Sequence, residues 1–299
     1  RRHVITSTIE HPAVRNACAR LEREGVEVTY LPAGPDGVVD PGDVRRALRP
    51  ETVLITVMHA NNELGTIQPI AEIARLGRQA GVAVHSDGVQ AVGKIPVDVR
   101  ELGVDLYSLS GHKIYAPKGA GALYVREGVK LDPLVFGGRH ERGLRPGTEN
   151  LPGLVALGRA AAWAQHNLVL EAARLAALRD RLERGILERV PGAAVNAASS
   201  PRLPNTSSIR FEGLTGDAML IALDLEGFAV SSGAACSSGA VEPSHVLKAI
   251  GLSHEQGRST LRFSLGRSND AAQVDELVDA VAAVADRLRR LAPVDATHA

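Results

Sequence analysis

Residues 104–113 read Val-Asp-Leu-Tyr-Ser-Leu-Ser-Gly-His-Lys, a short apolar run that ends in polar side chains. Two similar apolar runs precede it at residues 52–58 and 82–85, and the stretch 70–80 between those two has the apolar period of a helix. Strands that alternate with helices are typical of β-α-β units, which build mostly parallel sheets. We therefore predict an α/β fold whose ligands collect at the carboxyl ends of the strands.

The rest of the chain predicts a bridge and a second domain. Residues 154–190 are rich in Ala, Leu, Arg and Glu, which predicts one or two long helices. An α+β pattern follows, with strands expected at 207–211 and 260–264 and helices at 215–226 and 270–291. We thus expect a large domain at 1–153, bridging helices at 154–190 and a small C-terminal domain at 191–299.

The composition argues against several classes of protein. Of 299 residues, 34 are basic and 34 acidic, so the formal net charge is zero and neither nucleic acid nor an anionic membrane is an expected partner. The sequence contains no apolar run of about 18 residues, the length that suggests a membrane span. Its two cysteines, Cys18 and Cys236, are too few and too far apart for a disulfide framework or a metal site. A reducing cytosol is the expected location.

Polar residues at the ends of two predicted strands could form a cofactor site. Lys113 could form a Schiff base with an aldehyde, although an isolated lysine just past a strand is usually a surface residue. Asp87 could pair with a protonated pyridine nitrogen or cap a helix. Gln90, about one turn later, could donate to a phenolate oxygen or face solvent. A carboxylate and a lysine at the ends of successive strands together predict a pyridoxal-phosphate site.

Several short motifs span residues 10–267. They are Glu-His-Pro-Ala-Val at 10–14, Asn-Asn-Glu-Leu-Gly at 61–65, Asp-Gly-Val-Gln-Ala-Val-Gly-Lys at 87–94, Ser-Gly-His-Lys-Ile-Tyr at 110–115, Gly-Gly-Arg-His-Glu-Arg-Gly-Leu-Arg-Pro-Gly-Thr at 137–148, Ser-Gly-Ala-Ala-Cys at 232–236 and Arg-Phe-Ser-Leu-Gly-Arg at 262–267. In this order they resemble the motifs of cysteine desulfurases, which are pyridoxal-phosphate enzymes of fold type I. The resemblance implies conversion of L-cysteine to L-alanine, with the sulfur left on an enzyme cysteine.

The resemblance also implies how the matching residues treat the cofactor ring. Lys113 would form the Schiff base and later move protons, while Asp87 would hold the ring nitrogen and Gln90 the phenolate oxygen. His11 would stack on the ring. Asn62 would help to position both cofactor and substrate.

Further roles concern the phosphate and the substrate. Ser110 and His112 would bind the cofactor phosphate, and Thr148 would reach the phosphate of a neighbouring subunit, which implies a homodimer. Arg267 would hold the substrate carboxylate, a task suited to a planar guanidinium. By itself, an arginine after a strand would more often be a surface cation.

Cys236 is the expected sulfur acceptor. A lone cysteine is more often a buried, inert residue, and Cys18 in its helical pattern fits that description. Residues 231–240, however, contain no large apolar side chain, which predicts a mobile loop that lets the thiol travel. The spacing from Cys236 to residues 242–247 resembles the longer-loop branch of the family, which serves iron–sulfur cluster assembly. Sulfur-acceptor proteins such as an iron–sulfur scaffold are the implied partners.

The sequence departs from the family in a few places. An early Asp-Asn-Ala-Ala-Thr-Thr motif and a Ser-Gly-Ala-Thr-Glu phosphate loop do not occur, so we interpret the chain as a fragment whose large domain is incomplete at its start. Ser86 and Gly88 stand where Thr and Ala are commoner, and we expect both to be tolerated. Three alternatives stay open: a selenocysteine lyase, an aminotransferase of the same fold, and a truncated homologue that binds partners without turnover.

Overall fold

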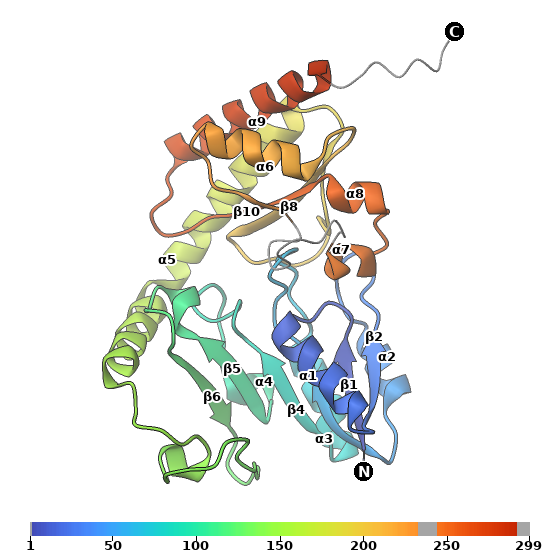
Figure 1. Cartoon of the computed structure of the whole chain (residues 1–299), viewed down its shortest axis with the longest axis vertical. Coiled ribbons are helices and arrows are strands. Elements are labelled where there is room, and N and C mark those ends of the chain that lie inside the picture. The colour runs from blue at the N-terminus through green and yellow to red at the C-terminus, as the bar shows by residue number, and fades with distance from the viewer. Residues whose placement is uncertain (1, 233–243, 292–299) are drawn as a thin grey trace.

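Six strands form the sheet of the larger body in a computed structural model that describes residues 2–232 and 244–291 (Figure 1). Their order is β2-β1-β3-β4-β5-β6. The bounds are β1 His3–Ser7, β2 Glu27–Leu31, β3 Thr52–Thr56, β4 Ala83–Asp87, β5 Leu106–Ser110 and β6 Gly121–Val125. Neighbouring strands run parallel except for β6, which is antiparallel to β5. The predicted mostly parallel α/β sheet is confirmed.

Helices cover this sheet and bury its apolar side chains. They are α1 Pro12–Arg23, α2 Pro41–Ala47, α3 Ile70–Ala80 and α4 Val99–Leu102. The core between them contains Ile5, Ile55, Ile73 and Val84, each at most 1% exposed. Helix α3 has the bounds that the sequence predicted, and it ends where Gly81 adopts the left-handed conformation that glycine tolerates best. We call this body the large domain.

A second, antiparallel sheet forms the small domain, in the order β7-β8-β10-β9. Its strands are β7 Ala193–Val195, β8 Thr206–Phe211, β9 Ser231–Ser232 and β10 Thr260–Ser264, and its helices are α6 Gly216–Leu225, α7 His245–Ala249, α8 His254–Arg258 and α9 Ala271–Leu291. Helices α6 and α9 pack on the sheet around a separate apolar core that includes Phe211, Leu223 and Val281. The predicted α+β pattern is confirmed.

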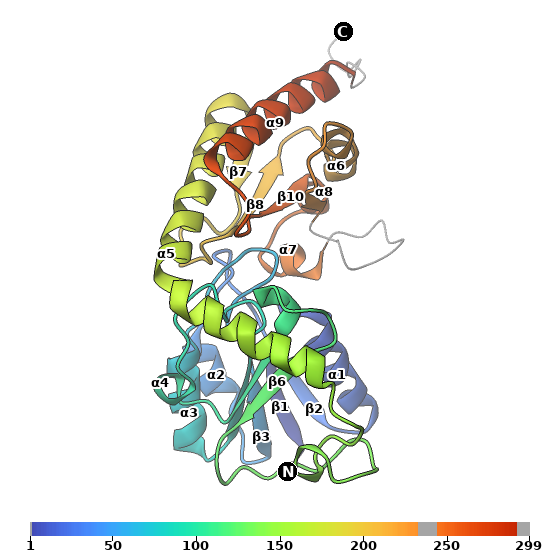
Figure 2. The same ribbon diagram turned by 90° about the vertical axis from the view of Figure 1, so that its left-hand side faces the viewer.

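Helix α5, Leu151–Arg189, connects the two domains as one continuous helix of 39 residues. Figure 2 shows that it runs past the large domain and continues along the small one. It packs against the short 3-10 helix η1, Gly111–Ile114, near its start and against α9 near its end. Because it packs on η1 of the large domain and contributes side chains to the core of the small one, it sets the distance between the two sheets.

The structure also contains elements that the sequence did not predict. Strands β2, β7 and β9, helices α2, α4 and α8, and the 3-10 helix η2 at Glu141–Gly143 are all short or lie at sheet edges. Such elements show little apolar periodicity. Strand β3 ends at Thr56, two residues earlier than the predicted run 52–58. Strand β4 ends at Asp87, two residues later than the predicted run 82–85. Within the described residues, no helix combines the length and apolar character needed to cross a bilayer.

Candidate active site

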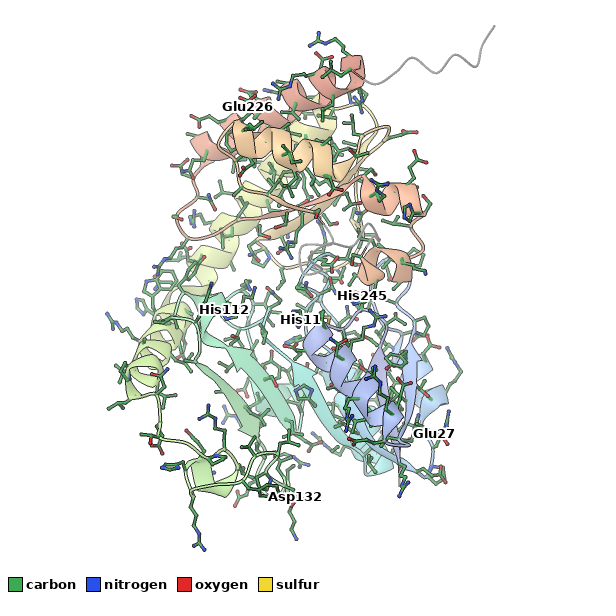
Figure 3. The ribbon with its side chains drawn as sticks, viewed as in Figure 1. His11, Glu27, His112, Asp132, Glu226 and His245 are labelled. Carbon is green, nitrogen blue, oxygen red and sulfur yellow. The ribbon has the colours of Figure 1, made fainter. Side chains whose placement is uncertain are left out.

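The carboxyl ends of the parallel strands meet at one edge of the large sheet, facing the small domain. His11 follows β1, Asn62 follows β3, Asp87 ends β4, and Lys113 follows β5 in η1. Figure 3 shows His11 and His112 at this edge, with His245 of the small domain across from them. The topology therefore gathers residues that lie far apart in the sequence, as expected for a ligand site in such sheets.

Asp87 lies at the buried end of β4 and is 8% exposed. Its carboxylate accepts a hydrogen bond of 3.0 Å from the Val89 amide, so it also caps the turn that follows. The His59 amide donates to the Asp87 carbonyl over 2.8 Å. These backbone contacts hold the carboxylate at the sheet edge.

An aromatic pair lies beside Asp87. The Tyr107 hydroxyl and His59 Nδ1 form a buried hydrogen bond of 2.7 Å. Burial lowers the pKa of His59 to about 4, so its ring is neutral at pH 7, and the tautomer of that ring sets which of the two groups donates. Burial and the nearby Asp87 raise the pKa of Tyr107. A Cβ atom on Gly88 would lie only 2.0 Å from the Tyr107 ring, so Tyr107 occupies the space that a side chain at 88 would need.

Lys113 lies in η1 with its side chain exposed, directly after the end of β5. Ser110 lies three residues before Lys113 and His112 one residue before it. A hydrogen bond of 2.7 Å joins Ser110 Oγ and His112 Nδ1. Burial, followed by the positive charges of Lys113 and Lys118, lowers the pKa of His112. The Ser110 and His112 pair thus offers a hydroxyl and a neutral imidazole next to the amine.

Asn62 lies in the turn after β3, and the side chain of its neighbour Asn61 holds the backbone of that turn in place. The fully buried Asn61 accepts hydrogen bonds at Oδ1 from the amides of Glu63 and Leu64 and donates from Nδ2 to the Ile9 carbonyl, all within 2.9 Å. Asn61 is therefore a structural residue, and Asn62 is left half-buried at the sheet edge. His11 is also fixed, because its Nδ1 accepts a 3.1 Å hydrogen bond from Ala13 N as the N-cap of α1.

The structure separates the two arginines of the 262–267 motif. The Arg267 guanidinium stacks over Tyr115 at 4.5 Å from the ring centre, with Trp163 at 5.5 Å. Arg262, on β10, instead extends from the small domain and donates from Nη1 to the Asn62 carbonyl over 2.9 Å. Arg262 was not among the predicted site residues, although the same motif contains it. Its position within the predicted strand 260–264 was the signal that could have indicated a second candidate for binding the carboxylate.

Glu63 adds a buried carboxyl group next to Arg262. Its Oε2 is buried and has no hydrogen-bond partner within the described ranges. Burial raises the pKa of Glu63 to about 7, against the opposing effects of a hydrogen bond from Ser244 and the charge of Arg262. Ser244 also caps α7 by accepting a hydrogen bond from Val246 N. The carboxyl group thus links the turn that presents Asn62 to the start of α7.

Cys236 lies outside the described residues, and so does most of its Ser/Gly/Ala-rich segment. The described residues on both sides of that segment touch the site. Ser231 of β9 pairs in register with Arg262, and His245 Nε2 lies 2.9 Å from the Glu10 carbonyl, next to His11. Cys18 lies in α1 and is buried, as expected of a structural cysteine.

Within the described residues, no hydrogen bond joins the side chain of Thr148 to Ser110 or His112. It is exposed in the segment between β6 and α5. Because β6 runs antiparallel to β5, this segment begins at the edge of the sheet opposite the site, at the lower left in Figure 1. It also carries the exposed apolar side chains Leu134 and Phe136, which are 96% and 85% exposed.

Comparison with known proteins identifies the family. The chain matches the class-V aminotransferase family over residues 1–277. It is 46% identical to the cysteine desulfurase IscS of Methanosarcina thermophila over 293 residues, which are 98% of this chain and 72% of that protein. The chain belongs to the cysteine desulfurases.

Solved structures of relatives share the fold of this desulfurase. A NifS-like protein superposes with a TM-score of 0.88 at 35% identity, over 96% of this chain and 76% of the other. SspA in complex with cysteine superposes with a TM-score of 0.77 at 39% identity, over 89% of this chain and 74% of the other. The expectation of a fold type I enzyme with a small C-terminal domain is confirmed.

Pyridoxal phosphate is the cofactor of this family, and the residues at the desulfurase site fit it. The site offers an amine for the aldehyde and a buried carboxylate for the pyridine nitrogen, from Lys113 and Asp87. It also offers an aromatic ring, and a hydroxyl and imidazole pair that can donate to a phosphate, from His11, Ser110 and His112. The described residues contain no cluster of His, Cys, Asp and Glu that could hold a metal ion.

Proposed function

We propose that this desulfurase converts L-cysteine to L-alanine and takes up the sulfur on Cys236 as a persulfide. One observation carries the proposal. Asp87 ends β4 and Lys113 follows the adjacent strand β5. At the same sheet edge, Arg262 binds the Asn62 carbonyl and His245 lies beside the Glu10 carbonyl, and Ser231 pairs with Arg262. These contacts support a cofactor site and a carboxylate-binding group contributed by the two domains, with the described flanks of the Cys236 segment beside them.

The proposed cofactor contacts follow the chemistry of each side chain. Lys113 Nζ would bond the aldehyde carbon, Asp87 would hold the ring nitrogen and His11 the ring, while Ser110 and His112 would bind the phosphate. When bound, pyridoxal phosphate withdraws electrons from the substrate carbon next to its amino group. Once the substrate amine has replaced it on the cofactor, the freed Lys113 Nζ would accept the proton that leaves that carbon and later return a proton to the product.

We propose that Arg262 holds the substrate carboxylate, in preference to Arg267. The Arg262 guanidinium already donates to the Asn62 carbonyl and has further N–H groups for a carboxylate. Its Nε is buried and has no partner in the described part of the chain. The Arg267 guanidinium, in contrast, covers the rings of Tyr115 and Trp163.

The proposed sulfur transfer balances without an external oxidant. The Cys236 thiolate attacks the substrate sulfur, so a sulfur–sulfur bond forms and the bond between that sulfur and the substrate Cβ breaks. The electron pair of the broken bond stays on the carbon side and is used to bind a proton, which gives the methyl group of alanine. The persulfide then passes to an acceptor protein such as an iron–sulfur scaffold. A reducing cytosol would keep the thiol free.

We further propose a homodimer in which Thr148 contacts the phosphate bound by the other subunit. Thr148 is exposed in the segment between β6 and α5, and exposed Leu134 and Phe136 lie in the same segment. Large apolar side chains that are this exposed are typical of a subunit interface. We also keep the domain division at 153 and 190 as a proposal, which is supported by the separate apolar cores on either side of α5.

The Cys236→Ser variant tests the function. We expect this variant to bind pyridoxal phosphate and cysteine but to release alanine far more slowly, because a neutral hydroxyl is a poor nucleophile toward sulfur. Mass spectrometry of the parent after a cysteine pulse should show one added sulfur on Cys236, and Cys18→Ser should behave like the parent. Alanine release by Cys236→Ser at the parent rate, or sulfur on Cys18, would disprove the mechanism. Parallel assays with selenocysteine and with a keto acid test the lyase and the aminotransferase alternatives.

A further inference from the structure

Lys94 lies at the end of the turn that follows Asp87, and it has no role in the function proposed above. Its Nζ donates to the Gln90 carbonyl oxygen over 2.9 Å and to Gln90 Oε1 over 3.0 Å. Both hydrogen bonds are partly buried. One ammonium group thus binds both the main chain and the side chain of the residue that is expected to face the cofactor's phenolate oxygen.

This contact fixes which way the Gln90 amide points. The oxygen and nitrogen of a glutamine amide usually have to be assigned from their partners. A lysine ammonium has three donors and no acceptor, so the Gln90 atom next to it has to be the oxygen. The Gln90 Nε2 group therefore points away from Lys94, and it donates to no group in the described parts of the chain. Two N–H donors stay available for a ligand.

The packing of the turn explains why Lys94 lies there. Gly93 has a φ of 73°, and a Cβ atom on it would lie 2.7 Å from Ile114 Cγ2 and 3.2 Å from Ala164 Cβ. Without a side chain at 93, the turn packs directly on η1 and α5 and brings Lys94 close to Lys113. Burial, and then the charge of Lys113, lower the pKa of Lys94 to about 8. A desolvated ammonium of this kind needs hydrogen-bond acceptors, and Gln90 supplies two.

We propose that Lys94 is a positioning residue that holds the Gln90 amide so that its Nε2 donates to the phenolate oxygen of the cofactor. This inference rests on the proposed function, because it needs the cofactor at Asp87 and Lys113. An amide that is already oriented loses less conformational entropy when the ligand binds. The bond from Lys94 to Oε1 also polarises the amide, which strengthens its N–H donors. Lys94 acts through Gln90 and does not itself touch the reacting atoms.

A double-mutant cycle on the protein at its native length tests this proposal. The variants are Lys94→Met, Gln90→Ala and the two combined, with Lys94→Arg as the control that keeps a donor. Two measurements are made on each: the dissociation constant of pyridoxal phosphate, and the pH midpoint of the visible absorbance of the bound cofactor. The melting temperature of the cofactor-free protein reports on the turn itself.

We expect Lys94→Met to weaken cofactor binding by about five- to tenfold, which is the effect expected from weakening one hydrogen bond between Gln90 and the cofactor. The pH midpoint of the cofactor's visible absorbance should also shift. The double variant should match Gln90→Ala, because the two residues act as one unit. Lys94→Arg should stay close to the parent. Additive losses in the double variant would overturn the proposal, and so would a Lys94→Met protein that melts earlier but keeps the parent's dissociation constant and midpoint.

The assay separates this proposal from the proposed function. A parent protein that binds the coloured cofactor but forms no persulfide and no alanine would disprove the desulfurase reaction, while the cycle on cofactor binding would still decide the role of Lys94. A parent that takes up no pyridoxal phosphate would overturn both.

Discussion

At the scale of single residues, the site depends on a few side chains whose partners come from distant parts of the sequence. Arg262 and Arg267 lie in one motif, but Arg262 reaches Asn62 and Arg267 stacks on Tyr115. Gly88 leaves room for the Tyr107 ring, which in turn hydrogen-bonds His59. The two arginines and the contact between Gly88 and Tyr107 each lead to a prediction that substitutions can test.

The two arginines should differ in their effect on cysteine binding. We expect Arg262→Ala to weaken the apparent affinity for cysteine by about 2–4 kcal/mol, because the substrate carboxylate would lose its charged partner. Arg267→Ala removes a contact with aromatic rings worth about 0.5–1 kcal/mol and should leave the affinity nearly unchanged. Spectral titration with cysteine in a Cys236→Ser background measures both. A larger loss for Arg267→Ala would return the carboxylate-binding role to Arg267.

The close contact between Gly88 and Tyr107 predicts a cost for a methyl group at 88. Gly88→Ala should lower the free energy of unfolding by about 1–3 kcal/mol, because the new Cβ would overlap the Tyr107 ring. Tyr107→Leu relieves the overlap but leaves a cavity and an unpaired His59. We therefore expect the double variant to be more stable than the sum of the single effects predicts. Urea unfolding of the four proteins would show the coupling, and strictly additive effects would contradict it.

At the scale of elements, the turn after β3 and the start of α7 share a buried carboxyl group. Glu63 on the turn bonds Ser244, the N-cap of α7, and its pKa is raised to about 7 by burial. Short helices such as α7 have little intrinsic stability, so contacts of this kind hold them in place. The position of α7 matters because it directly follows the segment that carries Cys236.

The raised pKa of Glu63 predicts how stability depends on pH. Between the ordinary pKa of about 4.5 and the folded value of about 7, the folded state binds a proton that the unfolded state has lost. Glu63 therefore stabilises the fold less as the pH rises through this window, and above it the loss is complete. We expect Glu63→Gln to flatten the fall in unfolding free energy between pH 5 and pH 8. Urea titrations at both pH values test this, with exposed Glu72→Gln as the control. A variant that keeps the parent's slope would show that Glu63 is not the group responsible.

At the scale of the whole molecule, the active site lies between two sheets, and one helix fixes how they are spaced. Helix α5 packs on η1, which carries Lys113, and on α9 of the small domain. The segment before it leaves Leu134, Phe136 and Thr148 exposed. A second subunit would explain this exposure.

The dimer proposal predicts that a charge on this segment separates the subunits. We expect the parent to sediment as a dimer and Phe136→Asp to sediment mostly as a monomer, because a carboxylate would be buried without a partner. Analytical ultracentrifugation measures this directly, and Lys130→Asp, which changes an exposed charge nearby, serves as the control. A parent that is monomeric at micromolar concentration would rule out the proposed contact through Thr148.

The sequence by itself determined the alternation of strands and helices, because apolar periodicity depends on local spacing. Helix α3 and strand β10 have the predicted bounds, and the polar residues at the ends of β4 and β5 were predicted to form a site for the same reason. The tertiary structure alone decided which residues meet. Arg262 and Asn62 are 200 residues apart, and only the packing of the small domain on the large one brings them together. Lys94 and Gln90 are close in the sequence, so their contact is local. Its proximity to the candidate site, however, depends on the close packing at Gly93, which brings Lys94 near Lys113. Such contacts depend on how whole elements pack against one another, and local periodicity along the chain does not specify that packing.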